Sequence, residues 1–164
     1  MHVRCRQALP DDFDALQQML ELYQYELSDL WHQDLDASGR YGYELSRHRE
    51  ARRFFAYVAL QGSQHIGFAL VAPAAVTRTD GAWMEQFFIL KRHRRSGAGR
   101  ALARFVLARH PGQWEIGQMP GNTRAQAFWR KVIDEFTHGA YAEVEVTDGP
   151  WLGVVQQFSV PDAR

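Results

Sequence analysis

The sequence has almost no cysteine, no long apolar run and no excess of charge of either sign, and each of these absences excludes a class of protein. Cys5 is the only cysteine among the 164 residues, so the chain can form neither an internal disulfide nor a cysteine-based metal cluster. No run approaches the roughly 18 apolar residues that a membrane-spanning helix needs, and the N-terminus has no apolar signal-peptide core. We therefore expect a cytoplasmic protein that does not bind a membrane.

The charge balance argues against a protein whose main partner is a nucleic acid. The 19 Lys and Arg residues are matched by 19 Asp and Glu residues, whereas nucleic-acid binding needs a basic excess. The charge is nevertheless uneven, because residues 91–95 are almost continuously basic. A local basic cluster on a neutral protein suits one small anionic ligand better than a polyanion.

Length and patterning predict one domain that spans residues 1–164. The chain is 46% apolar and 23% charged, near the averages for globular proteins. Apolar runs and turn signals predict strands at 2–9, 54–60, 65–72, 83–90, 114–119, 141–146 and 152–160, with a four-residue hairpin connection at 61–64. Helical spacing predicts helices that begin at 10–12 and cover 44–53, 99–110 and 122–132, with a loop over 28–43. This order fits a single α/β (α+β) domain.

The segment from Arg94 to Arg100 joins the buried strand at 83–90 to a helix and has the features of an anion-binding loop. Gly97 and Gly99 allow backbone N–H groups to approach a ligand closely. The helix that follows presents unpaired N–H groups and the positive end of its dipole. Arginines on both sides of the glycines add charge and can make two hydrogen bonds to a phosphate group. These features predict a loop that binds a pyrophosphate, although the pattern is neither a Walker loop nor the six-residue dinucleotide motif.

Two motifs give the sequence its resemblance to a known family. Arg94-Arg95-Ser96-Gly97-Ala98-Gly99 matches the pattern Gln/Arg-x-x-Gly-x-Gly/Ala, and Asn122 begins Asn-x-x-Ala-x-x-Phe-Trp. With the hydrophobic strand before the first motif, this arrangement resembles the GNAT family of N-acetyltransferases. The match is at the level of motifs over residues 83–130 and extends in element order to most of the chain.

The resemblance implies a fold, a co-substrate and a set of residues that bind it. The fold would be a single mixed, mostly antiparallel sheet, flanked by helices, with its central fourth and fifth strands splayed apart. Acetyl-CoA would be the co-substrate, with its pyrophosphate on the backbone N–H groups of residues 95–100 and no metal involved. Its pantetheine arm would pair with strand residues 87–89, opposite Asn122. The expected coenzyme-binding residues are Phe87, Phe88, Ile89, Arg94, Arg95, Ser96, Gly97, Ala98, Gly99, Arg100 and Asn122.

The catalytic part of the resemblance is incomplete. Many members place a tyrosine seven residues after the asparagine to protonate the departing sulfur, and here that position is Trp129, whose indole cannot usefully give up a proton. We expect Glu85, on the strand that leads into the site, to act as the base, and Tyr141 to reach the sulfur. Glu115 and His138 are further candidates.

The acceptor is expected to be a primary amine of a small molecule or a peptide. Several aromatic side chains and carboxylates in the first helix, the loop after it and the last hairpin would suit a cationic amine; they are Tyr23, Tyr25, Trp31, Tyr41, Tyr43, Trp151, Glu26, Asp29, Asp34 and Asp36. Two alternatives remain open, namely a non-catalytic acyl-CoA sensor and an acyltransferase that acts on a protein N-terminus or lysine. The protein would be a monomer or a homodimer.

Overall fold

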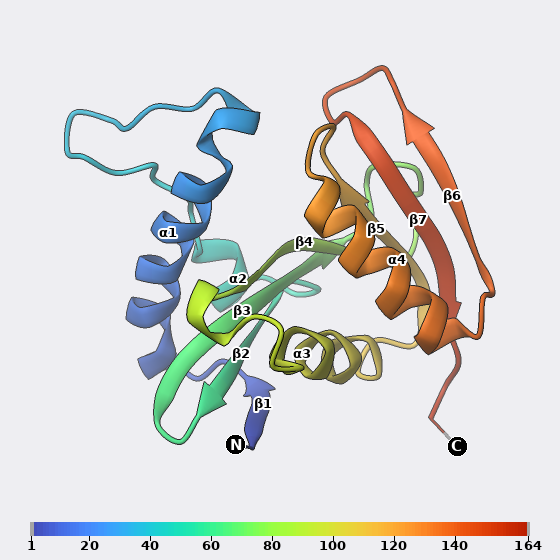
Figure 1. Cartoon of the computed structure of the whole chain (residues 1–164), viewed down its shortest axis with the longest axis horizontal. Coiled ribbons are helices and arrows are strands. Elements are labelled where there is room, and N and C mark those ends of the chain that lie inside the picture. The colour runs from blue at the N-terminus through green and yellow to red at the C-terminus, as the bar shows by residue number, and fades with distance from the viewer. Residues whose placement is uncertain (1, 164) are drawn as a thin grey trace.

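The computed structural model describes residues 2–163, so that the two ends of the expected domain, Met1 and Arg164, lie outside the described residues. Seven strands form one sheet in the order β1-β2-β3-β4-β5-β7-β6 (Figure 1). Their bounds are β1 (Val3–Gln7), β2 (Phe55–Gln61), β3 (Gln64–Pro73), β4 (Ala82–Ile89), β5 (Gly112–Gln118), β6 (Tyr141–Val146) and β7 (Gly153–Val160). Every neighbouring pair is antiparallel except β4 and β5, which are parallel. The expected mixed, mostly antiparallel sheet is therefore confirmed.

Helices cover both faces of the sheet and bury a separate apolar cluster on each. On one face lie α1 (Phe13–Trp31) and α2 (Ser46–Glu50), and on the other lie α3 (Ala98–Leu107) and α4 (Thr123–Thr137), as Figure 1 shows. Leu16 and Leu20, one helical turn apart, pack from α1 against Phe68 of β3. Leu102 of α3 and Ile133 of α4 pack on the opposite face. Alternation along the strands supplies both clusters, because successive strand residues point to opposite faces.

Helix ends differ most from the sequence prediction. The first helix continues to Trp31 and ends at His32, whose φ of 50° is left-handed, so the loop expected over 28–43 begins four residues later. The apolar face simply continues, since Leu27 is buried like the residues before it, and no glycine or proline interrupts the helix there. The helix expected over 44–53 shortens to α2, and α4 runs on to Thr137.

The hairpin between β2 and β3 also closes more tightly than expected. The connection is Gly62-Ser63 rather than four residues, because Gln61 and Gln64 still pair across the strands. Gly62 has a φ of 61°, which glycine adopts without strain and which suits a two-residue turn. None of the helices formed by residues 2–163 is long and apolar enough to cross a membrane.

Candidate active site

The two central strands separate and leave a cleft between them. β4 and β5 pair at only two positions, Ala82 with Trp114 and Trp83 with Glu115, and have no further paired residues. The edge of β4 beyond Trp83 is therefore not covered by β5, and the two strands diverge in Figure 1. A cleft of about 1480 Å³ opens here, lined by both strands, the end of α1, the loop at 94–100 and α4. An open strand edge beside a cleft offers backbone N–H and C=O groups to an extended ligand.

A β-bulge places Glu85 at the point of divergence. The pairing of β3 with β4 shifts register between Leu70 and Val71, which face Gln86 and Met84, so that Glu85 is the extra residue on β4. A bulge bends its strand and changes the direction of a side chain. Glu85 consequently turns toward α2 and lines the cleft. The sequence gives no signal for this bulge, since the run from 83 to 90 looks uniformly strand-like.

Glu85 is held by three side chains from the segment around α2. Tyr43 donates its hydroxyl at 2.7 Å, Arg47 donates Nη2 at 3.2 Å, and Nε2 of His48 lies 2.8 Å from the other carboxylate oxygen. Burial by itself would raise the pKa of Glu85, but the hydrogen bonds from His48 and Tyr43 and the charge of Arg47 outweigh it and lower that pKa. The carboxylate is therefore ionised and fixed in orientation, with 15% of its side chain exposed.

The loop before α3 presents its backbone to the cleft. After the short 3-10 helix η2 (Lys91–His93), Arg95 and Gly97 adopt left-handed φ values of 60° and 88°. The first hydrogen bond of α3 joins the N–H of Ala101 to the carbonyl of Gly97 at 2.9 Å. The N–H groups of Ala98, Gly99 and Arg100 therefore have no acceptor within the helix. The N–H of Ala98 makes one long contact, 3.4 Å, with the Ser96 hydroxyl. Such N–H groups at the positive end of a helix dipole favour an anion, so the geometry is compatible with the predicted anion site.

The arginine side chains of this loop have different tasks. Arg94 makes a two-pronged ion pair with Glu26 of α1, both contacts at 2.6 Å, and its Nε donates to the carbonyl of Ile89 at 2.7 Å. This arginine therefore ties α1 to the loop and is already occupied, as is the carbonyl of Ile89. Arg95 is exposed and lines the cleft. Arg100 also lines it but pairs with Glu135 at 2.8 Å.

Most of the expected coenzyme-binding residues share this one cleft. Its lining includes Phe87, Phe88, Ile89, Arg94, Arg95, Gly97, Gly99, Arg100 and Asn122. The side chains of Ser96 and Ala98 do not line it, because the Ser96 hydroxyl donates to the carbonyl of His93 at 2.6 Å and Ala98 is fully buried. The side chains of these two residues are therefore not placed for the role expected of them, and the N–H of Ala98 contacts the Ser96 hydroxyl at 3.4 Å.

Asn122 and Trp129 stand on α4, which forms one wall of the cleft. Oδ1 of Asn122 caps the helix by accepting from the N–H of Ala125 at 3.4 Å, and capping leaves the amide N–H groups of Asn122 available to a ligand. Trp129 is 4% exposed and packs edge-on against Phe87 and Phe128, with ring centroids 4.8 and 5.1 Å away. The indole in the usual tyrosine position therefore serves as packing in the wall of the cleft.

Two of the four candidate catalytic residues lie away from the cleft, and a third has a structural task. Tyr141 begins β6 opposite Phe158 and packs against the core cluster, and neither it nor His138 lines the cleft. Glu115 is fully buried and accepts hydrogen bonds from the backbone N–H groups of residues 75–77 and from the Thr77 hydroxyl, at 2.6 to 2.9 Å. Among the four, Glu85 alone reaches the cleft.

Because Glu115 organises the β3–β4 connection, its loss should reduce stability without directly affecting chemistry. Glu115→Gln turns one accepting oxygen into an NH₂ group that faces N–H donors. We expect the free energy of unfolding to fall by about 1–3 kcal/mol, the cost of leaving buried polar groups unsatisfied. Urea denaturation followed by circular dichroism measures it. A change below about 0.5 kcal/mol would mean that the four hydrogen bonds contribute little.

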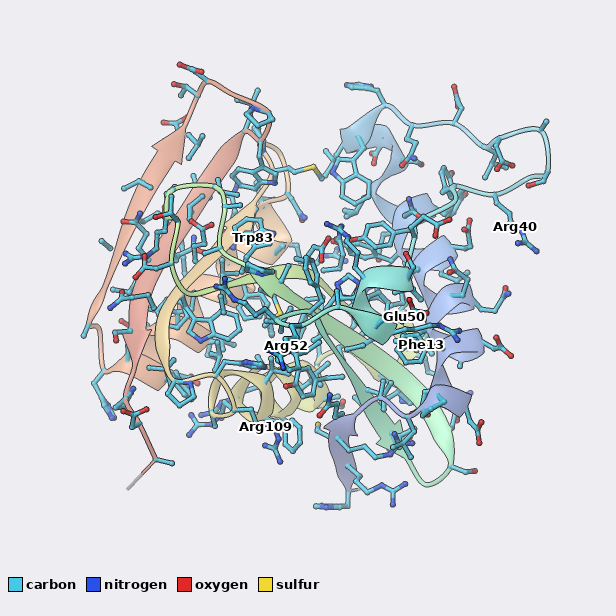
Figure 2. The ribbon with its side chains drawn as sticks, turned by 180° about the vertical axis from the view of Figure 1, so that it is seen from behind. Phe13, Arg40, Glu50, Arg52, Trp83 and Arg109 are labelled. Atoms are coloured by element: carbon cyan, nitrogen blue, oxygen red, sulfur yellow. The ribbon has the colours of Figure 1, made fainter. Side chains whose placement is uncertain are left out.

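Aromatic side chains line the half of the cleft that lies away from the loop. Trp83 and Trp151 pack edge to face with ring centroids 5.4 Å apart, and Tyr23 packs edge-on against Trp31 at 5.8 Å. In Figure 2, Trp83 is seen between α1 and the β5–β7–β6 side of the sheet. The expected acceptor residues divide accordingly: Tyr23, Glu26, Asp29, Trp31 and Trp151 line the cleft, whereas Tyr25, Asp34, Asp36, Tyr41 and Tyr43 do not.

Sequence reasoning missed two residues that shape the site, Arg47 and His48. Both lie in a charged stretch that reads as a solvated surface helix, yet the side chain of His48 is fully buried against Glu85. They are 38 and 37 residues from Glu85 in the chain. A histidine in a run of charged residues carries no sequence signal that would separate it from its solvated neighbours.

Comparisons with known proteins agree with this geometry. A model of the acetyltransferase (GNAT) family matches residues 15–133, well over half of the chain. Among solved structures, an acetyltransferase from Thermus thermophilus superposes with a TM-score of 0.70 at 17% identity, covering 98% of each chain. A ribosomal-protein-alanine N-acetyltransferase from Brucella melitensis superposes with a TM-score of 0.64 at 19% identity, covering 96% of this chain and 99% of that one.

A third structure, the PaiA N-acetyltransferase from Thermoplasma acidophilum in complex with coenzyme A, gives a TM-score of 0.66 at 14% identity, covering 97% of this chain and 99% of that one. At such identities these likenesses show the fold alone. A search of curated proteins gave no significant match. The segment that the family model matches includes β4, the loop at residues 94–100 and the first part of α4. The chain belongs to the GNAT family of acetyltransferases.

Proposed function

We propose that the protein transfers an acetyl group from acetyl-CoA to a primary amine by direct attack. The observation that carries this proposal is that the anion-binding loop and an ionised, oriented carboxylate open into the same cleft, with an uncovered strand edge between them. The loop would bind the acetyl donor, acetyl-CoA, and the carboxylate would bind the amine acceptor. In this proposal residues 1–164 form one acyltransferase domain.

The donor would lie along the β4 side of the cleft. Its pyrophosphate would accept hydrogen bonds from the backbone of residues 95–100, with charge from Arg95 and Arg100. Its pantetheine arm would pair with the free edge of β4 near Phe87 and Phe88, because the carbonyl of Ile89 is already taken by Arg94. The amide of Asn122 would contact the arm from α4. This arrangement would deliver the thioester to the bulge at Glu85.

The chemical step joins the amine nitrogen to the thioester carbonyl carbon. As the N–C bond forms and the C–S bond breaks, the coenzyme leaves as a thiolate. Glu85 would bind the acceptor through its charge and take the proton that the nitrogen loses, directly or through water. A carboxylate with a lowered pKa does not retain this proton, which passes to solvent or to the more basic thiolate. No side chain is needed in the place of the family's tyrosine, consistent with the packing task of Trp129.

Direct attack requires both substrates to be bound at once, and steady-state kinetics test this. Cys5 lies on β1 and does not line the cleft, so the sole thiol of the chain is not placed to form an acyl-enzyme. Double-reciprocal plots of initial rates, with acetyl-CoA varied at several amine concentrations, should intersect. Parallel lines would indicate a covalent intermediate and would overturn the direct step.

The lowered pKa of Glu85 predicts the shape of the pH profile. Because that pKa lies below its ordinary value of 4.5, Glu85 stays ionised from pH 5 to pH 9. Its protonation should lower the rate only in more acidic solutions. Over this range log kcat/KM should rise with a slope of about one toward the pKa of the amine, which must be neutral to attack. A further acidic limb near pH 6–7 that disappears in Glu85→Gln would show that the pKa is raised instead.

A second function, an acyl-CoA sensor without catalysis, is favoured by one observation. Trp129 replaces the acid that many relatives use and is buried among aromatic rings. A sensor would bind acetyl-CoA with a thermal shift yet release no thiol with any amine. The fixed and ionised state of Glu85 argues for the enzyme, because a sensor would have no use for an oriented carboxylate at the open edge of β4.

A further inference from the structure

The acceptor half of the cleft contains more aromatic surface than the holding of an amino group requires. Trp83 on β4 and Trp151 in the β6–β7 connection meet over Gly117 of β5. A Cβ atom added to Gly117 would lie 2.5 and 2.6 Å from these two indoles, so the rings rest directly on the backbone of β5. Leu152, which is 46% exposed, also lines the cleft.

The charges of this region suit a single amino group. Four carboxylates line the cleft, but Glu26 is paired with Arg94 and Glu135 with Arg100. Of the other two, Asp29 is exposed near the end of α1. Glu85 lies two residues after Trp83 on the same strand and is itself bonded to Tyr43, Arg47 and His48. Three of the four carboxylates are therefore already paired with cations, and a flexible polycation would need several unpaired ones to offset the desolvation of its charges. One fixed carboxylate beside an apolar wall is suited to a cationic head on an apolar body.

From this arrangement we infer that the acceptor is a small primary monoamine whose amino group is separated by a short linker from a flat aromatic ring. The ring would pack against Trp83 and Trp151 while the amino group faces Glu85 and the thioester. Trp31, from α1, would limit the cleft on the opposite side. This inference rests on the proposed acetyl transfer and assigns its substrate class.

An amine panel tests the inference with the unmodified protein. Amine-dependent thiol release from acetyl-CoA is measured for 2-phenylethylamine and tryptamine against n-butylamine and putrescine. Stacking on aromatic rings and burial of the ligand ring should raise kcat/KM for the aromatic amines at least about tenfold over the other two. Thiol release from none of the amines would count against the proposed transfer itself. Equal or better turnover of n-butylamine or putrescine would overturn the aromatic assignment alone.

Two variants locate the ring. Trp151→Ala removes one indole from the wall and should raise KM for 2-phenylethylamine about tenfold, with a much smaller effect on n-butylamine. Gly117→Ala should also lower the preference for 2-phenylethylamine over n-butylamine, because the new Cβ atom displaces both indoles. Tyr25→Ala truncates an aromatic side chain that is 70% exposed and outside the cleft, and serves as the matched control. Equal loss for both amines in Trp151→Ala would mean that the ring does not pack there.

Discussion

Replacing Gly97 with glutamate is expected to abolish measurable binding of acetyl-CoA. The glycine caps α3 with a φ of 88°, at the centre of the backbone that would receive the pyrophosphate. A Cβ atom at this position meets no atom within 4 Å, so the new carboxylate would project without a steric clash and repel the phosphates. Like charges at an interface cost several kcal/mol, which corresponds to a loss of affinity of about 100-fold or more. Isothermal titration calorimetry measures it.

A neutral variant separates charge from backbone strain. Gly97→Gln has the same size and the same left-handed backbone, whose cost to a residue with a side chain is roughly 1–2 kcal/mol of stability. It should bind acetyl-CoA far more tightly than Gly97→Glu does, and both variants should show similar unfolding temperatures. If the two bound equally well, the loop would not be the site of the pyrophosphate.

Glu85→Gln should produce the largest loss of catalysis. Removing a positioned base lowers rates by roughly 10²–10⁴-fold, and the substitution also removes the charge that would attract the amine. The affinity for acetyl-CoA should remain within about twofold, because the loop at residues 95–100 is unaltered. Steady-state kinetics for the rate and calorimetry for the affinity together measure this separation.

The surroundings of Glu85 provide the control for this experiment. Tyr43→Phe removes the hydroxyl that donates to Glu85 at 2.7 Å but leaves the carboxylate in place. Because that hydrogen bond stabilises the charged form, its loss should raise the pKa of Glu85 and lower the rate far less than Glu85→Gln. A Glu85→Gln enzyme that kept more than about one third of its activity would show that Glu85 is only a structural ion-pair partner.

The coenzyme half of the site could be predicted from the sequence because it is local. Gly97, Gly99 and the arginines around them lie within seven consecutive residues, and their backbone requirements are properties of those residues alone. The strand before the loop could also be predicted from its apolar run, but its burial could not, because most of β4 is only partly buried and lines the cleft. The ion pair of Arg94 could not be predicted in this way, because its partner, Glu26, is 68 residues away in the chain.

The catalytic half depends on contacts between distant segments, which no local pattern encodes. Glu85 is turned by a bulge and held by Tyr43, Arg47 and His48, and the nearest of these partners in the chain, His48, is 37 residues away. Tyr141 follows the last helix in the chain, which suggests that it is near the site, yet as the first residue of β6 it pairs with Phe158 and does not line the cleft. Only the three-dimensional arrangement separates Glu85 from Glu115, two strand carboxylates of similar sequence context.

The central claim is tested most directly by measuring free thiol and acetylated amine together. Acetyl-CoA is mixed with the protein and 2-phenylethylamine, thiol is measured with a chromogenic disulfide, and the amine product is measured by mass spectrometry. We predict equal amounts of thiol and N-acetylated amine, with no thiol above the background rate when the amine is omitted. Binding of acetyl-CoA without amine-dependent thiol release, for 2-phenylethylamine and for the other amines of the panel, would contradict the account and leave the protein as a sensor.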